Sequence, residues 1–253
     1  MTGLLQVFIF ILGAAVGSFL NVVAGRLQSG KSFVRGRSHC PFCGATLRWY
    51  DLWPILSWLV LKGKCRYCRG KIAWRYLLIE IACAGLFLLG AIIFPDYKQL
   101  FIYLVAVSFF VVLFIYDGLT YIVPDKISLP AIVIIFFLNI ILAGKNPFNL
   151  LLAAGVGGAW FLIQFLLSRG RWVGGGDIRL GVLIGVLLGF PLVGLALLIA
   201  YVGGSIIALL LILTGKKGLG SRLPFATILL PATLITWLWG TLIWDWYINL
   251  LGF

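Results

Sequence analysis

The sequence predicts an all-α polytopic membrane protein with about eight transmembrane helices and a small cytoplasmic zinc-binding insert. Three observations lead to this fold class. Of 253 residues, 62% are hydrophobic and only 11% charged; long apolar runs recur along the chain; and four cysteines form two closely spaced pairs. Soluble chains contain about 45–50% apolar and about 25% charged residues, so a water-exposed surface cannot be built from this composition. We therefore expect most of the chain to lie in lipid.

Eight apolar runs are the candidate spans, because a helix of about 20 residues crosses about 30 Å of hydrocarbon. The run at 178–190 is shorter than the others and rich in glycine. The first run is followed by a basic segment and not by a small-residue cleavage site, so we expect it to be retained as a span. In order, the runs cover residues 4–25, 76–94, 100–116, 128–143, 149–168, 178–190, 192–213 and 224–250.

These runs predict three parts. Residues 1–25 are expected to form the first transmembrane helix, and residues 26–75 a cytoplasmic insert that binds zinc through four cysteines. Residues 76–253 are expected to form a transmembrane helical bundle. Only the insert is polar enough to form a separate water-soluble unit.

The distribution of basic residues predicts the orientation. If the N-terminus lies outside the cell, the loops that face the cytoplasm contain 18 of the 20 Lys and Arg residues, and the reverse orientation leaves only Lys98 and Lys145 inside. Positive residues favour the cytoplasmic side, so we expect both termini outside. The net charge of +13 is then a topology signal, and we expect no nucleic-acid partner. The cations of the insert either face anionic lipid or an acidic partner, or are simply solvated.

The cysteine spacing predicts a metal site. Cys40 and Cys43 form one C-x-x-C pair, Cys65 and Cys68 form a second, and 21 residues separate the pairs. Four thiolates at this spacing are typical of a structural zinc ion with no open coordination position. Two disulfides are the alternative, but the reducing cytosol disfavours them. Cys83, inside an apolar run, is expected to be a buried small hydrophobe.

The polar residues limit the possible chemistry. The chain contains one histidine, His39, which directly precedes a cysteine, so a Ser-His or Cys-His catalytic arrangement within the bundle is excluded. Carboxylates are the remaining acid–base groups. Asp51 is expected to be a solvated charge, and Glu80 is either paired with a basic neighbour such as Arg75 or functional.

Asp117 and Asp177 each lie where an apolar run meets the cytoplasmic boundary. Asp177 follows three glycines, Gly174 to Gly176, which allow positive φ values and close approach of the backbone. Taken singly, Asp177 is an N-cap and Asp117 a helix-end charge. Taken together, they lie at one membrane depth and can share a proton, activate water and polarise a scissile carbonyl, which is the chemistry of aspartic proteases.

Glycines four residues apart recur at Gly13 and Gly17 and again at Gly181, Gly185 and Gly189. Residues at this spacing share one face of a helix, where glycine lets a neighbouring backbone come close. We interpret both sets as helix-packing positions.

The sequence resembles the type IV prepilin peptidase family of bacterial membrane proteins over nearly its whole length. The four cysteines, the upstream Asp117 and the Gly174-x-Gly176-Asp177 motif together make the resemblance specific. The other matching segments are Gly17-Ser-Phe-Leu-Asn21, Asp51-Leu-Trp-Pro54, Gly63-Lys-Cys-Arg66, Arg75-Tyr-Leu-Leu-Ile-Glu80, Pro124-Asp125, Ile178-Arg-Leu180 and Leu223-Pro-Phe225.

The resemblance implies an aspartic endopeptidase that cleaves the basic leader of prepilins or pseudopilins on the cytoplasmic side of the bacterial inner membrane, serving a type IV pilus or a protein secretion system. It implies Asp117 and Asp177 as the catalytic pair, and the four cysteines as zinc ligands. Gly174, Gly176, Asp125 and Glu80 are expected to support the loops or the substrate. Family members commonly also methylate the new N-terminus with S-adenosylmethionine. That activity follows from the family alone, since the chain contains no nucleotide-binding glycine fingerprint after a strand.

Two alternatives come from other classes. A proton-coupled transporter or channel would use the two aspartates as a relay. Such sites usually lie near the membrane midplane on broken helices, and the short, glycine-rich run at 178–190 keeps this alternative open. A membrane-anchored zinc module without enzymatic activity would leave the glycine-flanked aspartate without a purpose.

Overall fold

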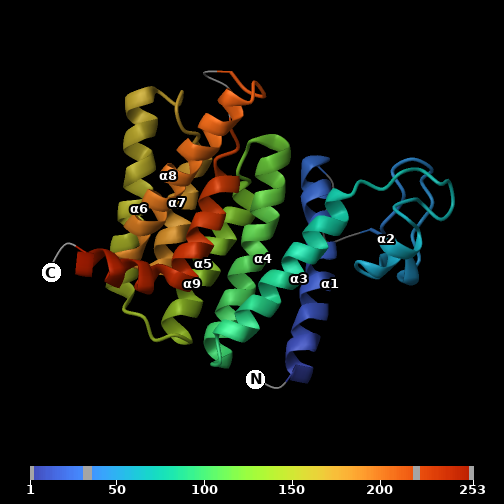
Figure 1. Cartoon of the computed structure of the whole chain (residues 1–253), viewed down its shortest axis with the longest axis horizontal. Coiled ribbons are helices and arrows are strands. Elements are labelled where there is room, and N and C mark those ends of the chain that lie inside the picture. Colours follow the sequence, from blue (N-terminus) through green and yellow to red (C-terminus); the bar gives the residue numbers. More distant parts are fainter. Residues whose placement is uncertain (1–2, 31–35, 219–222, 251–253) are drawn as a thin grey trace. The chain divides into compact units, whose positions relative to one another are not determined.

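A computed structural model describes residues 3–30, 36–218 and 223–250 (Figure 1). Residues 31–35 of the expected insert and 219–222 of the expected last cytoplasmic loop therefore lie outside the described residues. The described chain is helical, with two isolated β-bridges as its only extended pairing. The long helices are α1 (Gly3–Gln28), α3 (Arg75–Ile93), α4 (Tyr97–Thr120), α5 (Asp125–Ile141), α6 (Pro147–Ser168), α7 (Gly175–Leu188), α8 (Leu192–Leu213) and α9 (Ala226–Leu250). The insert contains the 3-10 turn η1 (Trp49–Leu52) and the short helix α2 (Leu56–Val60).

The all-α membrane fold is confirmed, but the count of eight spans is not. Each of the eight predicted runs forms a helix, and six of these helices in the described chain are long and apolar enough to cross a membrane. Helix α5 has 17 residues and α7 has 14. At 1.5 Å per residue they are roughly 26 and 21 Å long, short of the hydrocarbon thickness.

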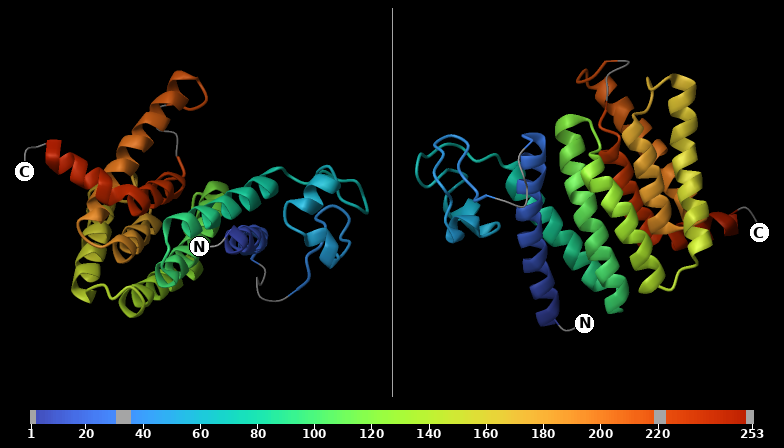
Figure 2. Two further views of the ribbon diagram at one scale, coloured as in Figure 1. Left: turned by 60° about the horizontal axis from the view of Figure 1, so that its bottom comes forward. Right: turned by 180° about the vertical axis from the view of Figure 1, so that it is seen from behind.

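The chain divides into two compact units, residues 1–115 and 116–253. In the first unit α1 packs against α3 (Figure 2). A Cβ added at Gly13 would lie 2.7 Å from Cβ of Phe87, and one at Gly17 would lie 2.9 Å from Cβ of Cys83. The first glycine pair is thus a packing position, as predicted. Cys83 is fully buried in this contact, which also confirms its prediction.

In the second unit α7 is the buried helix. The face that includes Leu180, Leu183 and Ile184 has no exposed surface. Helices α6 and α7 approach so closely that a Cβ at Gly181 would overlap the backbone of Gly157. The prediction of close helix packing is confirmed for Gly181 and Gly185, whereas Gly189 is the C-cap of α7, with a left-handed φ of 79°.

The surrounding helices also satisfy the end of α7. Asn139 Nδ2 donates to the carbonyl oxygen of Val186 at 2.8 Å, and Lys145 Nζ donates to that of Leu187 at 2.9 Å. The last carbonyls of a helix lack partners within that helix and are costly to leave bare in an apolar medium. A helix of only 14 residues can therefore end inside the protein.

Candidate active site and metal centre

Asp117 is held in the last turn of α4. The chain leaves the helix at Tyr121, whose backbone is left-handed at φ 56°. The Asp117 side chain is buried, at 4% exposure, and its Oδ2 accepts a hydrogen bond from the backbone N–H of Thr227 at 3.3 Å. The beginning of α9 therefore fixes a carboxylate that belongs to the end of α4.

Asp177 lies in the first turn of α7, where the helix dipole favours an anion. The backbone N–H of Gly174, the N-cap residue, donates to its Oδ2 at 2.9 Å. The expectation of positive φ is wrong for all three glycines, since none of Gly174 to Gly176 is left-handed. Close approach is the reason for glycine at position 176, because a Cβ on Gly176 would lie 2.7 Å from Cβ of Val123.

The segment between α4 and α5 brings the two aspartates into one site. It begins four residues after Asp117, and its Val123 packs on the Gly176 backbone beside Asp177. The two carboxylates are within electrostatic range, so the charge of Asp117 acts on Asp177. Of the predicted site residues, the structure thus groups Asp117, Asp177 and the flanking glycines.

Arg179 fastens this segment to α7. Its guanidinium forms a salt bridge with Asp125 and donates to the carbonyl oxygen of Val123 at 3.3 Å. Asp125 is the first residue of α5, and its ion pair with Arg179 holds the 121–125 segment next to α7. Sequence reasoning did not single out Arg179. The sequence did contain a signal for Arg179: it is a cation two residues after Asp177, in an otherwise apolar run.

The four cysteines form one cluster in the insert. All four sulfur atoms lie within 4.8 Å of one another, and none of the five cysteines is in a disulfide. The cluster can hold one metal ion. Hydrogen bonds from the backbone N–H of Cys43, with help from that of Phe42, outweigh the opposing effect of burial and lower the pKa of Cys40 to about 7. A lowered thiol pKa favours the thiolate, the form that binds a metal.

The two cysteine pairs adopt the same local fold. In the first, Cys40 accepts from the N–H of Gly44 at 2.9 Å; in the second, Cys65 accepts from that of Arg69 at 3.0 Å. Gly44 and Arg69 occupy equivalent positions and are both left-handed, with φ of 70° and 59°. Each turn contributes two sulfur atoms to the cluster. Two such turns, each with a C-x-x-C pair, are a usual way to bind one zinc ion.

Asp51 is not the solvated charge expected from the sequence. Its side chain is only 3% exposed and accepts bonds from Arg66 Nε at 2.7 Å, Tyr67 Oη at 3.1 Å and the backbone N–H of Arg48 at 3.1 Å. Burial alone would raise the pKa of Asp51, but these donors outweigh it and hold the pKa below its ordinary value. Arg66 and Tyr67 lie between Cys65 and Cys68, so Asp51 stabilises the turn that the second cysteine pair forms.

Glu80 belongs to the first unit and holds the insert there. It is 8% exposed, and its Oε2 accepts a hydrogen bond from the backbone N–H of Ile55 at 2.7 Å. Ile55 has a positive φ of 63° and begins α2. The acceptor on α3 thus anchors a turn of the insert.

The fold and these sites define a multi-pass helical membrane protein with two juxtaposed carboxylates and a separate four-thiolate metal cluster. Residues 11–94 match the bacterial peptidase A24 N-terminal domain, and residues 104–209 match the type IV leader peptidase family. The chain belongs to this family, and the resemblance noted in the sequence is confirmed.

Three relatives illustrate the match, each named prepilin leader peptidase/N-methyltransferase. That of Bacillus subtilis (strain 168) is 32% identical over 96% of this chain and 97% of the relative. That of Myxococcus xanthus (strain DK1622) is 36% identical over 85% of this chain and 66% of the relative. That of Burkholderia pseudomallei (strain 1026b) is 30% identical over 95% of this chain and 87% of the relative. No solved structure matches the chain significantly. These names give no support to the transporter or channel alternative.

Proposed function

We propose that this chain is a membrane aspartic endopeptidase that cleaves the leader of type IV prepilins or pseudopilins, and then methylates the new N-terminus with S-adenosylmethionine. The observation that carries the peptidase proposal is that Asp117 and Asp177 both border the 121–125 segment: Asp117 lies four residues before it, and its Val123 packs on Gly176 next to Asp177. The family match over residues 104–209 includes both. Methyl transfer rests on the names of the relatives.

Two neighbouring carboxylates titrate as a pair and hold one proton between them. The ionised member removes a proton from water, whose oxygen attacks the scissile carbonyl carbon, while the protonated member donates to the carbonyl oxygen. The tetrahedral intermediate then collapses with cleavage of the C–N bond, and the amine leaves with a proton returned from the pair. The Gly174 and Thr227 N–H groups orient the two carboxylates throughout.

The basic residues give the orientation of the proposed reaction. With both termini outside, 18 of 20 Lys and Arg residues face the cytoplasm of the bacterial inner membrane. The ends of the runs that carry Asp117 and Asp177 then lie at the inner face. A substrate with a basic leader in the cytosol and an apolar stem in the bilayer would present its cleavage site at that depth.

Zinc is the metal that best fits the four-thiolate cluster, with Cys40, Cys43, Cys65 and Cys68 as ligands. A four-thiolate set leaves no open coordination position, so the ion would stabilise the insert and take no part in hydrolysis.

Separate Asp117→Asn and Asp177→Asn variants test the peptidase. Each is expected to leave a co-expressed prepilin uncut, because an amide cannot exchange the proton that the pair shares. Asp96→Asn, in an exposed carboxylate at the beginning of α4, is the matched control and should process normally. Precursor and product are resolved by gel mobility, and full processing by either site variant would reject the pair. Labelled methyl transfer from S-adenosylmethionine to the product, in the same assay, tests the second activity.

A further inference from the structure

The insert carries an apolar surface that no part of the described chain covers. This surface, the docking face, comprises Trp49, Leu52, Trp53, Leu56, Leu59 and Val60. Their exposed fractions run from 41% at Leu52 to 75% at Val60. Leu56, Leu59 and Val60 share one face of α2, and the rings of Trp49 and Trp53 are in contact at 6.0 Å. Large apolar side chains exposed together on a polar unit indicate an interaction site.

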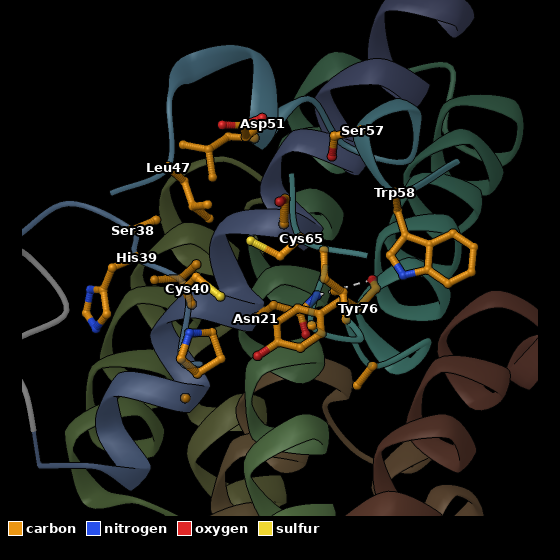
Figure 3. A pocket seen from close by; sticks show the side chains of 18 of the residues that line it. Asn21, Ser38, His39, Cys40, Leu47, Asp51, Ser57, Trp58, Cys65 and Tyr76 are labelled. Carbon is orange, nitrogen blue, oxygen red and sulfur yellow. Dashed lines mark hydrogen bonds between the residues drawn. The ribbon is translucent and has the colours of Figure 1, made fainter. Parts of the chain in front are cut away.

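The insert lies beside the membrane-spanning part of α1. A pocket of about 820 Å³ in the first unit is lined by the insert and by one face of α1, which includes Ser18, Asn21 and Gly25. Figure 3 shows Asn21 of α1 and Tyr76 of α3 close to Cys40 and Cys65 of the insert. Arg26 is the first cation after the apolar run, and Ser18 lies eight residues before it, roughly 12 Å deeper at 1.5 Å per residue. Residues of the insert therefore line one pocket with a part of α1 that precedes the first cation.

The bond to Glu80 places the docking face itself at this depth. Glu80 is five residues into α3 from Arg75, roughly 7 Å below the level of that cation. The Ile55 N–H is bonded to Glu80 at 2.7 Å, and the docking face continues on both sides of Ile55. Each headgroup zone of a bilayer is about 5–8 Å thick. With Arg75 at the outer edge of this zone, Ile55 would lie where headgroups meet acyl chains, and the docking face flanks it in sequence.

The residue types fit that depth. Tryptophan is enriched at membrane interfaces because its ring is apolar and its N–H is polar. Two lysines, Lys62 and Lys64, follow the face directly, on a turn with left-handed backbone at Lys62 and Gly63. Lysines that flank an apolar interfacial segment can extend their ammonium groups to lipid phosphates.

We infer that residues 49–60 are an interfacial membrane anchor: the docking face rests in the inner leaflet of the bilayer that α1 and α3 span, with Lys62 and Lys64 at its anionic headgroups. The insert is then a unit half-embedded in lipid and held at two points, by Glu80 from inside the protein and by the docking face from outside. This inference concerns the insert and does not depend on the reaction at Asp117 and Asp177.

Depth-dependent fluorescence quenching tests the anchor. The full chain is placed in nanodiscs that contain anionic phospholipid brominated either near the headgroup or near the acyl end. The contribution of Trp53 is the difference between the native chain and Trp53→Phe. We expect the shallow bromines to quench it several-fold more than the deep bromines or aqueous acrylamide do. Quenching by acrylamide alone, as for a face awaiting a protein partner, or by deep bromines alone, would overturn the inference.

A second variant separates docking from folding. Leu56→Gln with Leu59→Gln replaces two side chains that are about half exposed, at 53% and 52%, and that lie outside the cysteine cluster, so metal content should stay unchanged. Quenching of Trp53 by shallow bromines should fall and quenching by acrylamide should rise. If metal content is retained and both quenching values stay as in the native chain, the face does not anchor the insert.

Discussion

At the scale of single residues, surroundings decide what each carboxylate does. Asp51 is surrounded by three donors and becomes a structural centre of the insert. Glu80 accepts one backbone N–H and fixes a turn. Asp117 and Asp177 each accept a backbone N–H and lie within electrostatic range of each other, as the proposed pair requires.

Asp51→Asn should weaken the insert. The amide cannot form the ion pair with Arg66, and because Arg66 is 43% exposed we expect a loss of only about 1–2 kcal/mol. The rate at which a chelator removes the metal should increase. Arg66→Gln should have a similar effect, and the double variant should cost less than the sum of the two single changes. Additive effects would show that the two side chains act separately.

The same interaction has a pH dependence of known sign. Because the folded pKa of Asp51 is below its ordinary value, its stabilising contribution is complete at neutral pH. The contribution is lost as the pH falls through the ordinary value and then through the lowered folded value. In Asp51→Asn this acid-dependent part of the unfolding free energy should be absent.

Arg179→Gln should reduce leader cleavage by about 10- to 100-fold, because the segment that aligns the two aspartates loses its attachment to α7. The Asp125 side chain is 59% exposed, so stability should change by less than about 1 kcal/mol. Asp125→Asn should impair cleavage in the same direction, as measured by initial rates on a prepilin substrate. A large drop in thermal stability with an unchanged rate per folded molecule would contradict this role.

At the scale of elements, glycine allows α7 to be buried among its neighbours. Gly181 and Gly185 leave no room for a side chain between α7 and the backbone of α6. The resulting close packing, together with the caps on the last carbonyls, compensates for the short length of α7. The beginning of this rigid helix is where Asp177 lies.

Gly185→Ala should therefore destabilise the second unit by about 1–3 kcal/mol, the usual cost of overpacking. Gly155→Ala on α6 is the matched control, because an added Cβ there meets nothing within 4 Å. Alanine favours helix more than glycine does, so the control should be neutral or slightly stabilising. Thermal unfolding in detergent compares the two, and equal effects would disprove the close contact.

At the scale of the whole molecule, the transmembrane helices and the insert have different sources of stability. The helical bundle is stabilised by burial in lipid and protein, whereas the insert has few buried apolar residues and depends on its thiolate cluster, Asp51 and Glu80. The docking face would add contact with the membrane. It would also direct cations of the insert to lipid phosphates, which removes a source of repulsion for a basic leader.

Removal of the metal should unfold the insert and leave the bundle intact. Metal binding to a small thiolate site supplies folding free energy. Helical circular dichroism should change little, while protection of the 40–71 backbone from hydrogen exchange should be lost. Because thiols must ionise to bind, protons compete with the metal and the affinity should fall as the pH falls. Retained protection after complete metal removal would contradict this.

Part of this architecture follows from the sequence alone. Composition and run length determined that the chain is a helical membrane protein, because lipid requires every backbone group to be bonded within its own helix. Cysteine spacing predicted the metal cluster, and the motif around Asp177 predicted the family. These signals are local, so they survive without knowledge of the fold.

Only the tertiary structure decided which long-range contacts form. Nothing local to Asp51, Glu80 or Arg179 tells which group will meet it, and the partners of Asp51 and Glu80 are up to 25 residues away. The same holds for the count of spans, because α7 is short and its last carbonyl groups are satisfied by residues of other segments. The sequence determines which groups need a partner, and packing determines which partner each group finds.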